Sequence, residues 1–280
     1  MVVLVLGALL CADVRVFPAQ RDIRLEVHGT APSPARVVFF APHENEAVAN
    51  AYLARRLHGV PARFFVLRQH GERHVTFTLG DATYALDPNR MFTRAGVAAS
   101  LLGLNDHLVA GTSRFFEVQA RALALGRFVL GSFGPLAPDA TVVTLHNNTP
   151  GYDNDGRGGV GTISIKRYLK KLQGGSVFLT DVHVGRGDED DLFYVTDPAD
   201  FAALKKQRCN VVLQNPRVAV IPDEDDGSLS VWAAMAGYRY INIEAQRKDD
   251  AGRGRDHLRK QKAMVRRIMR LTGLTTGRGR

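Results

Sequence analysis

Two histidines and a glutamate in this chain have the residue types and the sequence context of a hydrolytic metal site. His43 and Glu46 form a His-x-x-Glu pair, and His146 follows an apolar run further along the chain. Two imidazoles and one carboxylate can hold catalytic zinc and leave a fourth position open for water. The pair alone also arises by chance, so the alternative is a capped helix start at Glu46 with His43 satisfied in the core. The segments around these residues must decide between the two interpretations.

Both histidines are expected at the carboxyl ends of buried strands. Residues 36–41 form a short apolar, β-rich run that Pro42 ends, which places His43 just beyond the strand. Residues 140–145 form a second strand candidate, with His146 at its exit. In open α/β sheets, ligands bind at this end of the strands. The two imidazoles are therefore expected to meet in one crevice.

The carboxylates have predicted positions of their own. Residues 46–57 have a helical pattern, so Glu46 is expected in the first turn of a helix, facing the same ion as His43. Residues 240–245 alternate like a strand, and Glu244 falls near its carboxyl end. A carboxylate beside a metal-activated water can accept a proton and return it to a leaving amine. The alternative for Glu244 is a strand-end residue exposed to solvent.

Asn89 and Arg90 form a candidate substrate-binding pair. Arginine is a rigid fork suited to bidentate binding of a carboxylate, and an adjacent asparagine can add a donor. A loop asparagine and a surface arginine after Pro88 are the alternative.

Four ordered segments together resemble the zinc carboxypeptidase superfamily, and most closely its aspartoacylase and succinylglutamate desuccinylase branch. The match covers about residues 25 to 247 in discontinuous pieces. The segments are His43 to Glu46, Asp87-Pro88-Asn89-Arg90-Met91-Phe92, Leu145-His146-Asn147-Asn148-Thr149 and Ile241-Asn242-Ile243-Glu244-Ala245-Gln246. The separation between His146 and Glu244 is longer than the resemblance implies, so an inserted segment is required.

The resemblance implies a role for each segment. His43, Glu46 and His146 would bind zinc, and Glu244 would act as the general acid/base. Asn89 and Arg90 would bind the free carboxylate of the substrate. The family also uses an arginine to polarise the scissile carbonyl, for which Arg73 and Arg157 are both candidates. A tyrosine that closes over substrate could be Tyr152 or Tyr238, each equally a packing residue.

Length and element order predict one α/β catalytic domain of 23–250 after a lead-in of 1–22, followed by a basic tail of 251–280. Strand and helix candidates alternate, which predicts a mixed, largely parallel sheet flanked by helices. The strand candidates are 63–67, 176–181, 192–196 and 210–213, and the helical stretches are 94–104, 113–130, 200–207 and 228–237.

The basic tail carries the net charge of the chain. Residues 252–280 hold ten Lys or Arg and one acid, which accounts for the net charge of +9, so the remainder is neutral and nucleic acid is not the favoured partner. Apolar residues recur at helical spacing from Leu258 to Leu271, which predicts a basic amphipathic helix. It could bind an anionic polymer or a membrane surface, or pack on the domain with a solvated charged face.

The first twelve residues are apolar and resemble the core of a secretory signal peptide, although no Lys or Arg precedes them. Periplasmic or secreted location is the expectation, with a buried first strand in a cytoplasmic protein as the alternative. Cys11 and Cys209 allow at most one disulfide and rule out a cysteine-rich zinc module. His183, which also follows a strand candidate, is the rival third metal ligand.

The leading hypothesis is a zinc hydrolase that cleaves an amide bond next to a free carboxylate. A carboxypeptidase acting on small peptides is one version, and an N-acyl amino acid deacylase is the other. The competing hypothesis is a non-catalytic binding protein on the same fold, attached to an anionic polymer or a membrane surface by its basic tail. Replacement of Glu244 by Gln and deletion of residues 252–280 discriminate between them.

Overall fold

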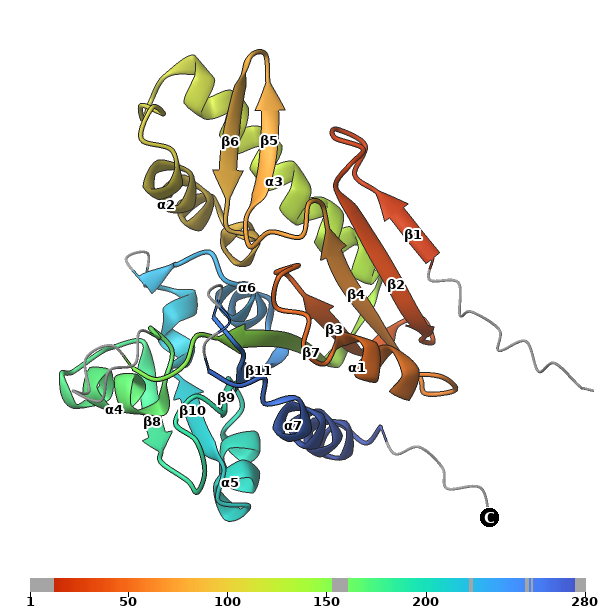
Figure 1. The fold of residues 1–280 in the computed structure, drawn as a ribbon, viewed down its shortest axis with the longest axis vertical. Helices are drawn as coiled ribbons and strands as arrows, with labels where there is room; N and C mark the ends of the chain where they lie inside the picture. The colour runs from red at the N-terminus through yellow and green to blue at the C-terminus, as the bar shows by residue number, and fades with distance from the viewer. Residues whose placement is uncertain (1–12, 153–160, 222–223, 250–251, 253, 275–280) are drawn as a thin grey trace, which may run out of the picture.

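The computed structural model describes residues 13–152, 161–221, 224–249, 252 and 254–274 of the chain (Figure 1). Within them, a nine-stranded mixed sheet has the order β1-β2-β4-β3-β7-β11-β9-β10-β8, and β5 and β6 form a separate hairpin. The strands are β1 (Asp13–Val16), β2 (Arg24–Thr30), β3 (Ala35–Ala41), β4 (Ala62–Arg68), β5 (Val75–Leu79), β6 (Ala82–Leu86), β7 (Leu136–Asn148), β8 (Leu179–His183), β9 (Leu192–Val195), β10 (Asn210–Gln214) and β11 (Arg239–Gln246).

Parallel pairing is concentrated in the middle of the large sheet. Strands β4, β3, β7 and β11 pair in parallel, as do β9 and β10. The pairs β1–β2, β2–β4, β9–β11 and β8–β10 are antiparallel. The central strands are buried on both faces, as their near-continuous apolar sequences predict. The expected mixed α/β sheet is confirmed.

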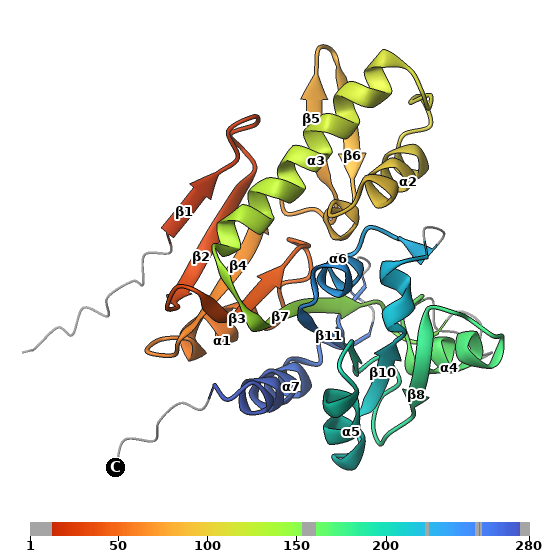
Figure 2. The same cartoon turned by 180° about the vertical axis from the view of Figure 1, so that it is seen from behind.

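Helices cover both faces of the sheet. They are α1 (Asn50–Arg56), α2 (Arg94–Leu104), α3 (Ser113–Phe133), α4 (Ile165–Gln173), α5 (Pro198–Lys206), α6 (Leu229–Ala236) and α7 (Leu258–Leu271), with short 3-10 turns η1 (Pro88–Arg90) and η2 (Pro216–Ala219). One buried cluster joins α2, α3 and α6 to the face that carries Val38 and Phe40. A second joins α1, α5 and α7 to the face that carries Val37 and Phe39. Successive residues of β3 thus fill both cores, and Figure 2 shows α3 on the face opposite α7.

Most predicted elements occur where the sequence placed them, with shifted ends. Helix α2 matches its predicted range, whereas α3 continues to Phe133 and α5 begins at Pro198. The earlier start of α5 has a local cause, because the Asp197 carboxylate caps the backbone N–H groups of Ala199 and Asp200. Strand β8 begins at Leu179, because a turn from Ser176 separates it from α4.

Helix α7 packs on the domain through its apolar side, as one of the two alternatives for the basic tail predicted. Met264, Val265, Ile268 and Met269 are buried against the sheet. Gln261 is also buried, and its Nε2 donates a hydrogen bond to the backbone oxygen of His146 at 3.1 Å. The helix therefore contacts the strand that carries a predicted metal ligand.

None of the helices in the described part of the chain has the length and apolar composition needed to cross a membrane. The predicted signal segment, residues 1–12, lies outside the described residues together with Cys11. Strand β1, directly after it, pairs with β2 at the edge of the sheet. Cys209 is buried and carries a free thiol.

Candidate active site

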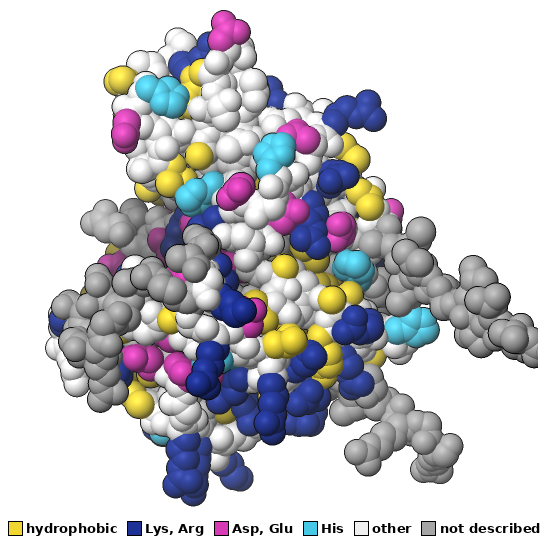
Figure 3. Space-filling model, viewed as in Figure 1, with side chains coloured by type: hydrophobic (Ala, Val, Ile, Leu, Met, Phe, Trp, Pro, Cys, Tyr) yellow, Lys and Arg dark blue, Asp and Glu magenta, His cyan; other side chains and the backbone are white. Residues whose placement is uncertain are grey.

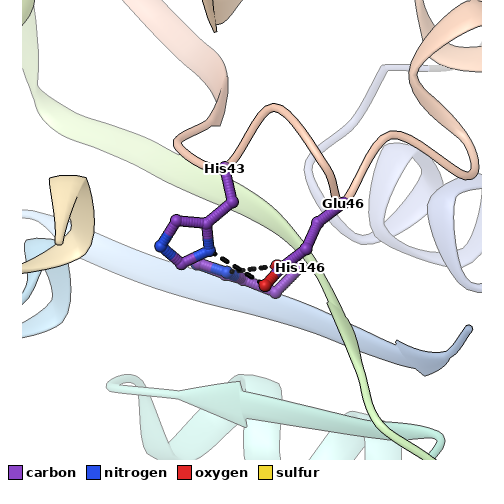
Figure 4. A group of neighbouring side chains, drawn as sticks. All are labelled: His43, Glu46 and His146. Atoms are coloured by element: carbon purple, nitrogen blue, oxygen red, sulfur yellow. Dashed lines mark hydrogen bonds and ion pairs between the residues drawn. The ribbon is translucent and has the colours of Figure 1, made fainter. Parts of the chain in front are cut away.

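The three predicted metal ligands converge on one point. One ligand atom from each of His43, Glu46 and His146 lies within 4.8 Å of the other two. All three residues are buried, with 1%, 2% and 4% of their surfaces exposed. Glu46 lies between the imidazoles, with 3.1 Å from Oε1 to Nδ1 of His43 and 3.1 Å from Oε2 to Nδ1 of His146 (Figure 4). Among the described residues, this is the one group of this kind.

Glu46 reaches the site from a turn, so its predicted place in the first turn of a helix is wrong. Helix α1 begins at Asn50, after turns closed by hydrogen bonds from Glu46 N to His43 O and from Asn50 N to Ala47 O. Glu46 Oε2 also accepts a hydrogen bond from Asn147 N at 3.0 Å. These contacts, and not a helical backbone, hold the carboxylate toward β7.

His146 lies inside β7, so its predicted place at the strand exit is also wrong. The strand continues to Asn148 because its last residues still pair with β11, where Asn148 is opposite Gln246. The two histidines nevertheless meet, because Phe40 of β3 pairs with Thr144 of β7. His43 follows Phe40 by three residues and His146 follows Thr144 by two, so both histidines lie near the same end of the paired strands.

Asp87 supports His43 from behind. Its Oδ1 lies 2.9 Å from Nε2 of His43, which leaves Nδ1 of that ring facing Glu46. Burial acts to lower the pKa of His43, but Glu46 and Asp87 outweigh it and raise that pKa to about 9. Burial acts to raise the pKa of Asp87, but His43, Arg73 and the backbone N–H of Asn89 together outweigh it and lower that pKa. A carboxylate in this position fixes the tautomer and orientation of a metal-binding imidazole.

Replacing Asp87 with Asn is expected to weaken zinc affinity by about 10- to 100-fold, because the histidine loses its charged partner. Asn retains the cap that Asp87 provides to Asn89 N in η1, so the turn should persist. Competition with a chromophoric chelator measures the affinity. Asp81→Asn, at the exposed tip of the β5–β6 hairpin, is the control. Equal affinities for the two variants would contradict the role of Asp87.

The histidines have atoms that a metal ion would satisfy. Nε2 of His146 is buried and has no hydrogen-bond partner, and Nδ1 of His43 is buried with an ion-pair contact to Glu46 Oε1 but no hydrogen bond. Buried polar groups are rarely left in this condition in native proteins. The pKa of His146 is lowered by burial, which favours the neutral form that binds metals. The donor set of two imidazoles and one carboxylate therefore fits a divalent ion such as zinc.

Glu244 lies beside this group. Strand β11 pairs with β7 so that Glu244 is opposite His146, and both residues contribute to the lining of one cavity. The side chain is buried rather than solvent-exposed, with 8% of its surface accessible. Burial and the nearby Glu46 carboxylate raise the pKa of Glu244 to about 8, against the effects of Asn242, Arg73 and His43.

The raised pKa of Glu244 predicts that the metal-free protein becomes less stable as the pH rises from about 5 to about 8. The folded protein retains a proton there that the unfolded chain releases, so the contribution is present at low pH and lost at high pH. By linkage, the loss from this group is at most about 4–5 kcal/mol. Glu244→Gln should therefore raise the free energy of unfolding more at pH 8.5 than at pH 5.5 in urea titrations. Equal gains at both pH values would contradict this.

Arg73 is the described candidate for polarising a substrate carbonyl. Its guanidinium contacts Glu46 closely and lies 3.8 Å from Asp87, at the wall of the cavity. Arg157, the other candidate, lies outside the described residues. Tyr238 packs against Trp232, with ring centroids 5.6 Å apart, and neither it nor Tyr152 lines the cavity.

Asn89 and Arg90 face the same cavity, which has a volume of about 550 Å³. Arg90 Nη1 lies 2.5 Å from Asp226 Oδ2, and both side chains are partly exposed. Oδ1 of Asn89 is buried and has no hydrogen-bond partner. The structure thus places the predicted carboxylate-binding pair and the predicted metal ligands around one space.

Several cavity residues were not identified from the sequence. Tyr168, Phe178 and Tyr194 form an aromatic wall, with centroids of Tyr194 5.8 Å from Tyr168 and 6.1 Å from Phe178. Asp226, the partner of Arg90, was also missed. An aromatic residue in a short helix or strand has the sequence pattern of a core residue, and Asp226 precedes Gly227 and Ser228 in a typical helix-cap sequence.

His183, the rival ligand, lies on edge strand β8 and does not join the metal-binding group.

Comparisons with known proteins find similarity at the level of structure. No family model and no curated protein sequence matches the chain. A succinylglutamate desuccinylase from Chromobacterium violaceum is 12% identical with a TM-score of 0.45, over 96% of this chain and 71% of its own. A protein described as a metallopeptidase from Shewanella denitrificans is 12% identical with a TM-score of 0.43, over 95% and 86%.

The tripeptide-bound cell shape determinant Csd4 from Helicobacter pylori is also similar. It is 12% identical with a TM-score of 0.43, and the match covers 90% of this chain and 56% of Csd4. The similarity is distant, so the case for the active site depends on its own geometry.

Proposed function

We propose that this chain is a zinc-dependent hydrolase that cleaves an amide bond next to a free carboxylate. The observation that carries the proposal is the buried group of His43, Glu46 and His146, which borders the same cavity as Glu244. Three protein ligands that face a cavity are typical of catalytic zinc, whereas structural zinc usually has four. Imidazole and carboxylate donors without thiolates suit zinc in a hydrolytic role.

The residues around the cavity have complementary roles in this reaction. Zinc bound there would supply Lewis-acid polarisation of water and of the scissile carbonyl. Glu244 would accept the proton of the attacking water and deliver it to the leaving amine. Arg73 would place positive charge beside the carbonyl oxygen as negative charge develops on it. One water is consumed, and a carboxylic acid and an amine are released.

Arg90 and Asn89 support a substrate with a free carboxylate. The guanidinium of Arg90 has five N–H donors, of which Asp226 engages Nη1, so donors remain for a bidentate contact. The aromatic wall of Tyr168, Phe178 and Tyr194 would contact an apolar part of the substrate. Both a carboxypeptidase acting on small peptides, including cell-wall peptides if the chain is exported, and an N-acyl amino acid deacylase fit this arrangement.

The test is a hydrolysis assay of the zinc-loaded protein with paired substrates. N-acyl amino acids and short peptides are compared with the same compounds whose terminal carboxylate is converted to an amide. We expect hydrolysis of at least one acid, and a loss of kcat/KM of about 100-fold or more for its amide, because the amide cannot form the charge-assisted bidentate contact with Arg90. Hydrolysis of neither form, or equal hydrolysis of both, would overturn the proposal. The acid that is cleaved distinguishes peptidase from deacylase.

The basic surface supports a second, independent role in binding an anionic polymer. The outer side of α7 carries Arg259, Arg266 and Arg270, and α5 adds Lys205 and Lys206, all exposed. Arg267 of α7 hydrogen-bonds Gln207 directly after α5, which joins the two helices. Figure 3 shows the cationic side chains gathered over this part of the molecule. Because the apolar side of α7 is buried in the domain, we propose purely electrostatic binding.

Inorganic polyphosphate is the probe for this second role. Binding is expected to weaken steeply with salt and to fall at least tenfold in a triple variant with Gln at Arg259, Arg266 and Arg270. The control has Gln at the exposed Arg36, Arg114 and Arg127, outside this surface. Equal losses in both variants would indicate a net-charge effect and contradict a defined surface. Binding to phosphatidylglycerol vesicles but not to polyphosphate would contradict the proposal that this surface binds an anionic polymer.

A further inference from the structure

Four side chains on two paired strands form a continuous chain of hydrogen bonds that ends at Glu244. The Tyr240 hydroxyl lies 2.6 Å from Thr144 Oγ1, and Thr144 Oγ1 lies 3.0 Å from Asn242 Oδ1. Nδ2 of Asn242 lies 3.0 Å from Glu244 Oε1. Tyr240, Asn242 and Glu244 are alternate residues of β11 and share one face, and Thr144 is opposite Asn242 on β7.

The direction of each hydrogen bond follows from the chemistry of its two ends. Glu244 Oε1 accepts, so the Asn242 amide must present Nδ2 to it and Oδ1 to Thr144. An amide oxygen only accepts, so Thr144 must use its single hydroxyl proton toward Asn242. The Tyr240 hydroxyl must then donate to Thr144. Thr144 and Tyr240 are buried, with 0% and 2% of their surfaces exposed, so the protein supplies these partners in place of bulk water.

We propose that Thr144 is a positioning residue for Glu244, acting through the Asn242 amide. With the Thr144 proton in place, Asn242 is held with Nδ2 toward Glu244. Without it, the amide can rotate by half a turn and place its oxygen against the carboxylate, which is repulsive. The bond to Oε1 restrains the carboxyl group and leaves Oε2 as the oxygen that exchanges protons. The catalytic task of Glu244 rests on the proposed function. The orientation of its carboxyl group rests on the hydrogen bonds alone.

The first test compares Thr144→Val with Thr144→Ser in the zinc-loaded enzyme, using whichever acid the paired-substrate assay shows to be cleaved. Val keeps the shape and removes the hydroxyl, whereas Ser keeps the hydroxyl. We expect Val to lower kcat about tenfold with KM and zinc content unchanged, and Ser to remain within about threefold of wild type. A merely structural role would make Ser, which leaves a cavity, at least as harmful as Val. A Val variant within twofold of wild type would also overturn the proposal.

The second test reads the orientation of Asn242 without turnover. The unfolding equilibrium of the zinc-loaded protein is measured for wild type, Thr144→Val, Glu244→Gln and the double variant. A glutamine at 244 can pair with either end of the Asn242 amide, so the amide no longer needs one orientation. We expect Thr144→Val to shift the unfolding equilibrium at least threefold less in the Glu244→Gln background than in wild type. Additive effects of the two substitutions on the unfolding equilibrium would overturn the proposal that Thr144 acts on Glu244 through Asn242.

The two tests fail separately. If no acid is hydrolysed, or if Glu244→Gln retains full turnover, the proposed function fails. The unfolding measurements on the four proteins then decide alone whether Thr144 orients Asn242 and Glu244. If Glu244→Gln abolishes turnover while Thr144→Val does not lower kcat, the proposed function stands and the positioning role of Thr144 is rejected.

Discussion

Glu244→Gln is expected to lower kcat by about 10³-fold or more while the protein still binds about one zinc ion. Glutamine fills the same volume and can accept a hydrogen bond from Asn242, but it cannot accept the proton of the attacking water. Glu244 is not among the three residues that form the metal-binding group, so the ion should remain. The measurements are kcat on a cleaved acid and zinc per chain by elemental analysis.

The control for this prediction is Glu117→Gln on α3. Glu117 is exposed, pairs with Arg114 three residues earlier and does not line the cavity. The Glu117→Gln substitution makes the same chemical change and should leave kcat within about twofold of the wild-type value, because surface substitutions have small effects. If Glu244→Gln keeps more than a tenth of wild-type kcat, another residue performs the proton transfer and the mechanism proposed here is wrong.

His146→Ala is expected to reduce zinc from about one ion per chain to near zero at micromolar free metal. The variant removes one of three ligands and leaves Glu46 Oε2 without its imidazole partner. Because zinc binds the folded protein far more tightly than the unfolded chain, the thermal stabilisation that added zinc gives to the wild type should also disappear. Elemental analysis and thermal melts with and without zinc measure the two effects.

His183→Ala provides the matched control, because the sequence offered His183 as the rival ligand. It lies at the end of edge strand β8, opposite Val211, and outside the metal-binding group. The variant should bind zinc like wild type and show the same zinc-dependent shift in melting temperature. Loss of zinc from His183→Ala, or its retention by His146→Ala, would reverse the choice between the two histidines.

The strand pattern of the sequence predicted the mixed sheet, and the strand pattern together with the family resemblance predicted the meeting of His43, Glu46 and His146. Apolar runs with defined ends specify buried strands, and parallel strands bring their carboxyl ends to one edge. Predicted ends were less accurate, because a helix or strand continues as long as tertiary partners satisfy its backbone. Glu46 was wrongly placed in a helix because residues 46–57 have helical periodicity, whereas contacts from β7 hold it in a turn.

The rest of the cavity could not be predicted, because its residues meet only through tertiary packing. Tyr168 is on α4, Tyr194 on β9 and Asp226 in the segment before α6, and no spacing in the sequence links them. The hydrogen-bond chain from Tyr240 to Glu244 depends on the register of β7 against β11. A shift by one residue would point Thr144 to the other face. Such sites become visible only when strand order and register are known.

The hydrogen bond from Gln261 to the backbone of His146 has a consequence for the order in which the protein matures. During synthesis, β3, β7 and β11 all leave the ribosome before α7, so the ligands can approach each other while one face of their strands still lacks part of its cover. Val143, Leu145, Ile241 and Ile243 on that face belong to the buried cluster that α1, α5 and α7 share, so their cover is complete once α7 docks. Under the proposed function, stable retention of the metal ion is therefore expected to be a late event in biogenesis, completed when α7 packs over the strands behind the ligands.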